Sequence, residues 1–202
     1  MNLRSVCCLA VVLLSLSAIS VAQSSELAIT AGAAFTPDTK GTPFCEVLTP
    51  CPSSGNISID PGFTIGGAFA HRLANFHAAS IALELPLFAA PSRRKPAFLV
   101  NVNFSSLFFT PSLKLNLLPG SSVSPFLSGG AGLGYFSGNT GNVTWATQIG
   151  CGLDFKTPLP HLGIRAEVRD FISGVPSIPE LNAITAGHLQ AIVAGGGVIF
   201  KF

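Results

Sequence analysis

The sequence predicts an all-β protein, an eight-stranded antiparallel up-and-down transmembrane β-barrel. Charged residues make up only 10 % of the 202 residues and the mean hydropathy is +0.56, although ordinary domains carry charge at about a quarter of their positions. Beyond residue 22, no window holds the roughly 18 consecutive apolar residues of a spanning helix. Hydrophobic residues instead alternate with polar ones, at the period of about two residues that indicates β-strands. The apolar surface of such strands must face lipid or a partner.

Residues 1–22 are expected to form a secretory signal peptide that is removed. Met1–Arg4 carries one positive charge and Val6–Val21 holds no charged residue. Small residues at Ser20-Val21-Ala22 then precede a cleavage point after Ala22. An uncleaved membrane anchor is the alternative, but the apolar run is short for a spanning helix. Residues 23–202 then form one β-barrel domain.

Cysteine usage is consistent with export. Cys45 and Cys51 lie six positions apart in a segment rich in Pro, Gly and Ser, where a disulfide could close a short loop in an oxidising compartment. Cys151 remains alone. It falls on the apolar face of its strand, so we interpret it as a small lipid-facing residue rather than a reactive thiol.

Strand alternation is clearest between residues 162 and 171. The apolar residues there lie on one face, and Arg165, Glu167 and Arg169 lie on the other. The segments 81–87, 112–117 and 145–156 alternate in the same way, which turns Glu84, Lys114, Asn116, Gln148 and Asp154 to the polar face. Four further strands are expected within 27–35, 63–72, 125–136 and 188–202. Gly and Ala fill their inward face, because a small barrel has little interior volume.

The connectors between these strands alternate in length. Short ones are expected at 73–75, 119–122 and 157–161, and longer ones at 36–58, 89–103, 137–142 and 172–187. An up-and-down barrel with one periplasmic and one external side sorts its connectors in this way. Hydrocarbon offers no hydrogen-bond partner to an open sheet edge, so the last strand must pair with the first. Tilted strands of roughly 9 to 11 residues are long enough to cross the bilayer.

The sequence resembles the OmpA-like family of eight-stranded outer-membrane β-barrels over residues 23–202. Two features carry the resemblance: the run PFLSGGAGLGY from Pro125 to Tyr135, and the ending VIFKF at Phe202. The resemblance implies that Phe202 belongs to the signal read by the barrel-insertion machinery, and that no periplasmic domain follows it. It also implies a location in the bacterial outer membrane, with outer-membrane lipids and lipopolysaccharide as partners. Family members often carry girdles of Trp and Tyr, whereas Trp145 and Tyr135 stand alone here and Phe takes most aromatic positions.

The inward polar residues are the candidate site. We interpret them as a charge-paired plug, because an unpaired buried charge costs several kcal/mol. The alternative is a narrow ion or solute path, or a gate in which a carboxylate exchanges arginine partners. The lumen charge network expected from the sequence comprises Glu84, Lys114, Asn116, Gln148, Asp154, Arg165, Glu167 and Arg169.

Three functions follow as hypotheses. The first is a non-enzymatic membrane barrel with a structural or surface-interaction role, whose longer loops, above all 36–58, make outside contacts. The second is a small channel through the lumen. The third is a soluble lipocalin-like carrier, which requires the opposite arrangement, an apolar interior and a polar exterior.

Other chemistry has little support in the sequence. His188 with Ser173 or Ser177 and Glu180 could be assembled into a catalytic set only as a weak signal, and His71, His77 and His161 are interpreted as interface or turn residues. We therefore expect no enzyme activity, no metal and no cofactor. The basic triplet Arg93-Arg94-Lys95 is interpreted as a solvated loop tip, with a lipopolysaccharide phosphate contact as the alternative. It is too short to indicate a nucleic-acid partner.

Overall fold

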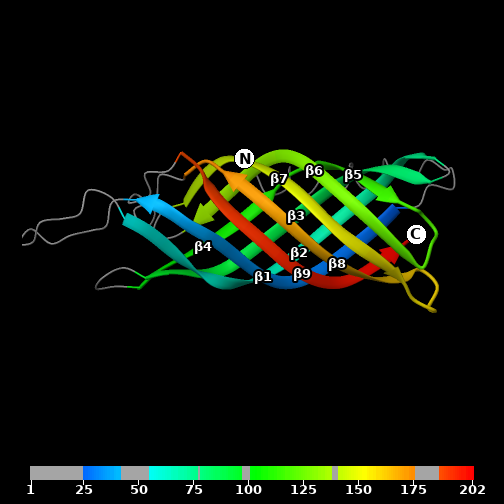
Figure 1. The fold of residues 1–202 in the computed structure, drawn as a ribbon, viewed down its shortest axis with the longest axis horizontal. Helices are drawn as coiled ribbons and strands as arrows, with labels where there is room; N and C mark the ends of the chain where they lie inside the picture. Colours follow the sequence, from blue (N-terminus) through cyan, green and yellow to red (C-terminus); the bar gives the residue numbers. More distant parts are fainter. Residues whose placement is uncertain (1–24, 42–54, 77, 97–100, 138–140, 176–186) are drawn as a thin grey trace, which may run out of the picture.

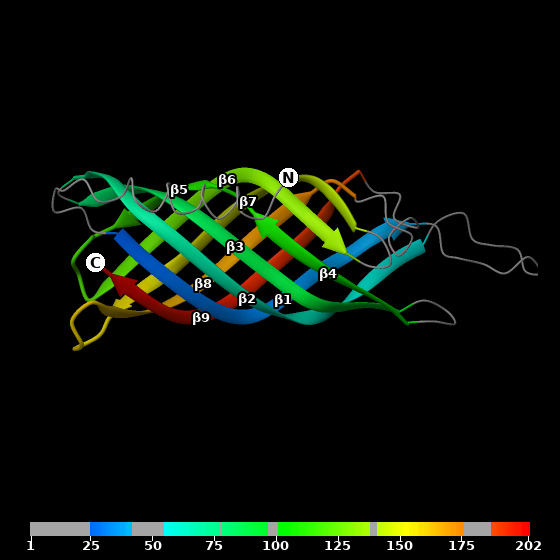
Figure 2. The ribbon, with the colours of Figure 1, turned by 180° about the vertical axis from the view of Figure 1, so that it is seen from behind.

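The chain forms one closed sheet of tilted strands (Figure 1 and, from behind, Figure 2). The computed structural model describes residues 25–41, 55–76, 78–96, 101–137, 141–175 and 187–202. Its strands are β1 (Ser25–Gly41), β2 (Gly55–Asn75), β3 (Ala79–Pro96), β4 (Asn101–Phe109), β5 (Ser112–Leu117), β6 (Val123–Ser137), β7 (Gly141–Lys156), β8 (Leu162–Ser173) and β9 (Leu189–Lys201). No helix in this part of the chain is long and apolar enough to cross a membrane.

All strand pairs are antiparallel, and the first and last strands close the sheet. β1 pairs with β2 along one edge and with β9 along the other. The closure extends to the first residue of β1 and to the C-terminus, because Ser25 and Phe202 exchange backbone hydrogen bonds of 2.7 and 2.9 Å. The sheet therefore has no free edge, as membrane insertion of a β-structure requires.

β4 and β5 together occupy one position in the barrel. Both pair with β3 on one side and with β6 on the other. They are separated only at Thr110 and Pro111, where proline has no N–H to donate to the sheet. The nine segments thus make a closed eight-stranded antiparallel barrel, which confirms the predicted fold class.

The strands run further than the sequence suggested. β8 has 12 residues and β2 has 21, against the expected roughly 9 to 11. Pairing of β1 with β2 continues to Gly41 and Gly55, and pairing of β3 with β4 continues to Pro96 and Asn101. Backbone groups outside a hydrocarbon layer can still satisfy one another by extending the sheet.

Several predicted connectors were therefore wrong. The segment 89–103 is mostly strand, and only 97–100 separates β3 from β4. Residues 73–75 belong to β2, where a register shift follows Arg72, and β3 begins at Ala79. Two connectors that were predicted to be longer are short: only 97–100 and 138–140 separate their strands. They are no longer than the turns at 118–122 and 157–161. The predicted alternation of short and longer connectors therefore holds only in part. We call the end of the barrel that carries the turns 118–122 and 157–161 the turn end. β2 ends and β3 begins there, and the C-terminus lies there too (Figure 1).

The outward face carries large apolar side chains on most strands. Ile149 on β7 is 72 % exposed and Phe63 on β2 is 60 % exposed. The apolar belt comprises, among others, Leu27, Ile29, Phe63, Ile65, Leu83, Leu85, Leu87, Leu113, Leu115, Leu127, Leu133, Trp145, Ile149, Ile164, Val168, Val198 and Phe200. Cys151 is exposed on the same face, as expected from the alternation of β7. A polar exterior, as the soluble-carrier hypothesis requires, is absent from the described part of these strands.

Inward glycines allow the narrow closure. A Cβ atom at Gly197 of β9 would lie 1.9 Å from the carbonyl oxygen of Ile29 on β1, and one at Gly32 would lie 2.1 Å from that of Ala194. Neither position has room for a side chain of any size. Small residues were predicted on the inward face, and at the seam between the first and last strands they are required sterically.

The basic triplet was predicted wrongly. Arg93 lies within β3, in register with Phe104 of β4, and is only 1 % exposed. The loop-tip interpretation failed because β3 continues to Pro96, and a register shift after Ala90 turns Arg93 inward.

Candidate functional site

The lumen holds the polar residues expected from the sequence. Buried there are Glu84, Lys114, Gln148, Asp154, Arg165, Glu167 and Arg169. Asn116 is half-buried nearer the turn end, where its side-chain amide donates a 3.4 Å hydrogen bond to Ser80. Glu26 of β1 joins the set, although the sequence analysis did not single it out.

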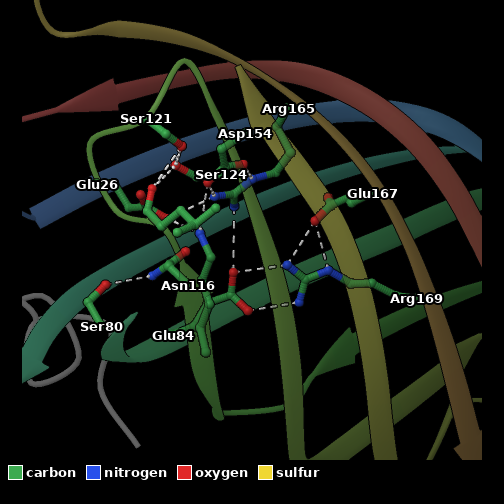
Figure 3. Close-up of polar contacts among 12 residues, drawn as sticks. Glu26, Ser80, Glu84, Asn116, Ser121, Ser124, Asp154, Arg165, Glu167 and Arg169 are labelled. Atoms are coloured by element: carbon green, nitrogen blue, oxygen red, sulfur yellow. Dashed lines mark hydrogen bonds and ion pairs between the residues drawn. The ribbon is translucent and has the colours of Figure 1, made fainter. Parts of the chain in front are cut away.

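One part of this network is built around Arg165 of β8. Its Nε and Nη2 donate to the two carboxylate oxygens of Asp154 on β7, at 2.7 and 2.8 Å. Nη2 also donates to Glu26 at 2.8 Å. Lys114 of β5 donates to the same two carboxylates. Two cations and two carboxylates from four strands therefore neutralise one another. Figure 3 shows Arg165 with Asp154 and Glu26.

The second part is built around Arg169, two inward positions beyond Arg165 along β8. Its Nη1 and Nη2 donate to the two carboxylate oxygens of Glu84 on β3, both at 2.9 Å. Nε and Nη2 donate to Glu167 at 3.0 and 2.8 Å, and Nη1 donates to Gln148 at 3.1 Å. Figure 3 shows Arg169 between the two carboxylates. Its side chain thus reaches across the lumen from β8 to β3.

Arg165 links the two parts. Its Nη1 lies 3.6 Å from Glu84 and has no hydrogen-bond partner among the described residues. The ring of Phe126 lies beneath both cations of the first part, with Lys114 Nζ at 4.4 Å and Arg165 Cζ at 4.7 Å from its centroid. These are cation–π distances, so an aromatic ring fills the space that the ion pairs leave.

A layer of phenylalanine rings lies on the other side of Arg169, away from the turn end. Phe108 and Phe171 stack with their ring centroids 4.7 Å apart. Phe136 meets Phe108 edge-on at 5.7 Å, and Phe88 meets Phe171 at 5.6 Å. We call these four residues the phenylalanine layer. Arg169 Cζ lies 5.0 Å from the centroid of Phe88, so the layer rests directly on the charge network.

The charge network and the phenylalanine layer together fill the lumen. Each cation of the network has carboxylate partners from other strands, and all four phenylalanines are at most 4 % exposed. Satisfied ion pairs avoid the penalty of several kcal/mol for an isolated buried charge. Hydrogen-bonded ion pairs and packed rings therefore follow one another along the lumen.

Two features of the site escaped the sequence analysis. Glu26 lies one residue before the segment that was taken as the first strand, although it shares the inward face with Ala28 and Thr30. The phenylalanine layer comes from four strands whose relative register the sequence does not give. Phe88 lies an even number of positions from Glu84 on the same strand, and Phe171 lies an even number from Arg169. Strand alternation therefore already indicated that both rings face the lumen.

The structure places the other sequence-based candidates only in part. Ser173 is buried and donates to the carbonyl oxygen of Leu189, while His188 is exposed. Ser177 and Glu180 lie outside the described residues, as do residues 1–22, Cys45, Cys51 and His77. His71 hydrogen-bonds Ser25 and His161 hydrogen-bonds the Lys201 carbonyl, both at the turn end. The described part of the chain holds no cluster of three metal-ligating side chains.

Comparison with known proteins supports the fold. No family model and no curated protein matches the sequence. The crystal structure of Neisserial surface protein A (NspA) is similar with a TM-score of 0.53 at 14 % identity, covering 89 % of this chain and 97 % of that one. The solid-state NMR structure of the outer membrane protein AlkL in lipid bilayers gives a TM-score of 0.50 at 13 % identity, covering 92 % and 93 %. At these identities the likeness establishes the barrel fold alone, and the OmpA-like family remains a prediction.

Proposed function

We propose that this chain is an integral protein of the bacterial outer membrane with a structural or surface-interaction role, without enzymatic activity and with an occluded lumen. The observation that carries the proposal is the filled interior: ion pairs that satisfy one another, capped by stacked phenylalanine rings. A protein built to conduct needs a continuous polar path, and a protein built to carry an apolar ligand needs an apolar cavity.

Membrane placement is supported by the outward face. Side chains such as Ile149 and Phe63 would cost roughly 1.5 to 3 kcal/mol each if they were left in water. A closed barrel with no free strand edge is also the β-structure that hydrocarbon tolerates. Outer-membrane lipids and lipopolysaccharide are therefore the proposed surroundings of the belt.

The turn end is proposed to face the periplasm, as the short-turn side of such barrels does. Phe202 lies there, 65 % exposed, after a strand already paired with β1. This position suits a residue that the insertion machinery reads before the barrel closes. Export through a signal peptide at residues 1–22 belongs to the same proposal.

A small channel is the second candidate, and one observation favours it. Arg165 Nη1 lies between the two parts of the network without a hydrogen bond, 3.6 Å from Glu84. The guanidinium could exchange carboxylate partners, which is how a gate would work. The phenylalanine layer argues against a permanently open path, because the rings would have to part as well.

Single-channel recording in a planar bilayer separates the two candidates. We expect no steady open level from the purified, refolded protein. A steady open level whose size shifts in Arg165→Ala or Glu167→Gln would overturn the occluded lumen and favour the channel. The exposed Lys156→Gln at the turn end is the matched control, because it changes charge without touching the network.

A further inference from the structure

Arg93 differs from the other buried cations of the described residues. Lys114, Arg165 and Arg169 each form ion pairs with carboxylates. Arg93 is equally buried, but no carboxylate of the described residues lies within ion-pair distance of it. A buried guanidinium without an anion is unfavourable unless something else balances its charge.

The surroundings of Arg93 are apolar on the side of the turn end. Its Nη2 donates to the hydroxyl of Thr36 on β1, across the width of β2. Its Cζ lies 5.8 Å from the ring centroid of Phe104, and Thr36 stands in register with Ile59. Phe104 and Ile59 belong to the same buried cluster as the phenylalanine layer. The guanidinium therefore lies over an apolar floor on the side of the turn end.

The guanidinium of Arg93 also has a hydrogen-bond donor without a partner. The Nε atom is buried and has no hydrogen-bond partner among the described residues. Nε and the Nη groups of an arginine form a planar fork that matches two oxygens of a carboxylate, sulfate or phosphate. Thr36, a neutral hydroxyl, holds one side of the fork without neutralising it.

We propose that Arg93, held by Thr36 above Phe104, forms the binding site for a small oxyanion at the end of the lumen opposite the turns. The site is separate from the charge network, since the phenylalanine layer lies between them. It does not depend on whether the barrel conducts. The anion could come from solution or from a lipid headgroup phosphate.

The test is an NMR titration of the Arg93 Nε–Hε signal in nanodiscs of zwitterionic lipid, with sulfate as the probe and chloride at equal ionic strength as the reference. We expect a saturable shift with sulfate and none with chloride. A second arm uses nanodiscs that contain anionic lipid and no sulfate; a shifted signal there identifies the headgroup phosphate as the source. A signal that stays unmoved in both arms overturns the site.

Variants extend the test without relying on one substitution. Because Arg93→Gln lacks the Nε–Hε signal, sulfate binding to this variant is followed through the backbone amide signal of Phe104, the register partner of residue 93. Binding should weaken at least about tenfold, whereas Lys156→Gln at the turn end should leave it unchanged. Thr36→Val keeps the guanidinium and should keep the saturable response, so it remains informative if Arg93→Gln does not fold. Sulfate binding of equal strength in Arg93→Gln would contradict the proposal.

Discussion

Arg169 and Glu84 are joined across the lumen by two parallel hydrogen bonds of 2.9 Å, although 85 positions separate them in the sequence. This bidentate pair fixes the register of β8 relative to β3, two strands that are not neighbours in the sheet. A bidentate arginine–carboxylate pair is stronger and more directional than a single contact. It connects opposite walls of the barrel from within.

Removing the charge of Glu84 should destabilise the barrel. Glu84→Gln leaves Arg169 with Glu167 as its one remaining carboxylate, and breaking a buried pair on one side costs about 3 to 5 kcal/mol. The free energy of unfolding, measured by denaturant titration in lipid vesicles, should fall by about 3 kcal/mol or more.

The exposed Asp38→Asn on β1 is the matched control, with an expected change of less than about 0.5 kcal/mol. Equal effects of the two substitutions would contradict the structural role of the pair. In a double-mutant cycle with Arg169→Gln, the two single effects should not add.

The two layers of the lumen should each keep it closed. Phe171→Ala removes a stacked ring and should cost about 3 to 5 kcal/mol of stability, but the ion pairs below it remain. Glu84→Ala combined with Arg169→Ala opens part of the network, but the phenylalanine layer remains. Neither variant should give a steady open level in a planar bilayer, provided that a gel assay confirms folding. A steady current through either variant would mean that the layer it disrupts is by itself what closes the lumen.

Gly197 should tolerate no side chain. An added Cβ would lie 1.9 Å from the Ile29 carbonyl oxygen at the seam between β9 and β1. Gly197→Ala should therefore reduce the folded fraction after refolding into detergent or lipid. Gly67→Ala is the control, because its Cβ would meet its nearest neighbour, the Ala28 carbonyl oxygen, at an ordinary 3.9 Å. Refolding of Gly197→Ala to the same yield as Gly67→Ala would refute the tight seam.

Cys151 should be shielded by lipid. Its side chain is exposed on the outward face of β7, between Ile149 and Leu153. With Cys45 and Cys51 replaced by serine, a charged, membrane-impermeant maleimide should label the vesicle-embedded protein slowly and the unfolded protein quickly. A cysteine placed at Ser121 in the exposed turn, with Cys151→Ser, should label quickly in both states. Fast labelling of Cys151 in vesicles would contradict the position of the belt.

The sequence predicted the strands well because a barrel in lipid enforces strict alternation. Ile164 and Val168 face outward while Arg165 and Glu167 face inward, as the alternation indicates. The lengths of the strands were less predictable. Outside hydrocarbon the sheet can continue with either polar or apolar residues, so the polar residues in 91–95 do not end β3, which continues to Pro96.

The partners within the lumen could not be derived from the sequence. Whether Glu84 meets Arg169 or Arg165 depends on the stagger between strands, which alternation does not report. Arg93 was misplaced for a related reason. A register shift after Ala90 changes which residues of β3 face inward. Pro91, which has no N–H to donate to the sheet, lies at this shift and was the local sign of it.

The central claim is that this chain is a compact, closed barrel embedded in the outer membrane. Gel migration of the membrane-extracted protein, with and without boiling in detergent, tests it most directly. The account predicts that the protein is found in outer-membrane fractions and that the unboiled sample migrates faster than the boiled one, because the closed sheet resists detergent. A soluble protein with no heat-dependent shift would contradict the account, since neither a closed barrel nor a lipid-facing belt would then be present.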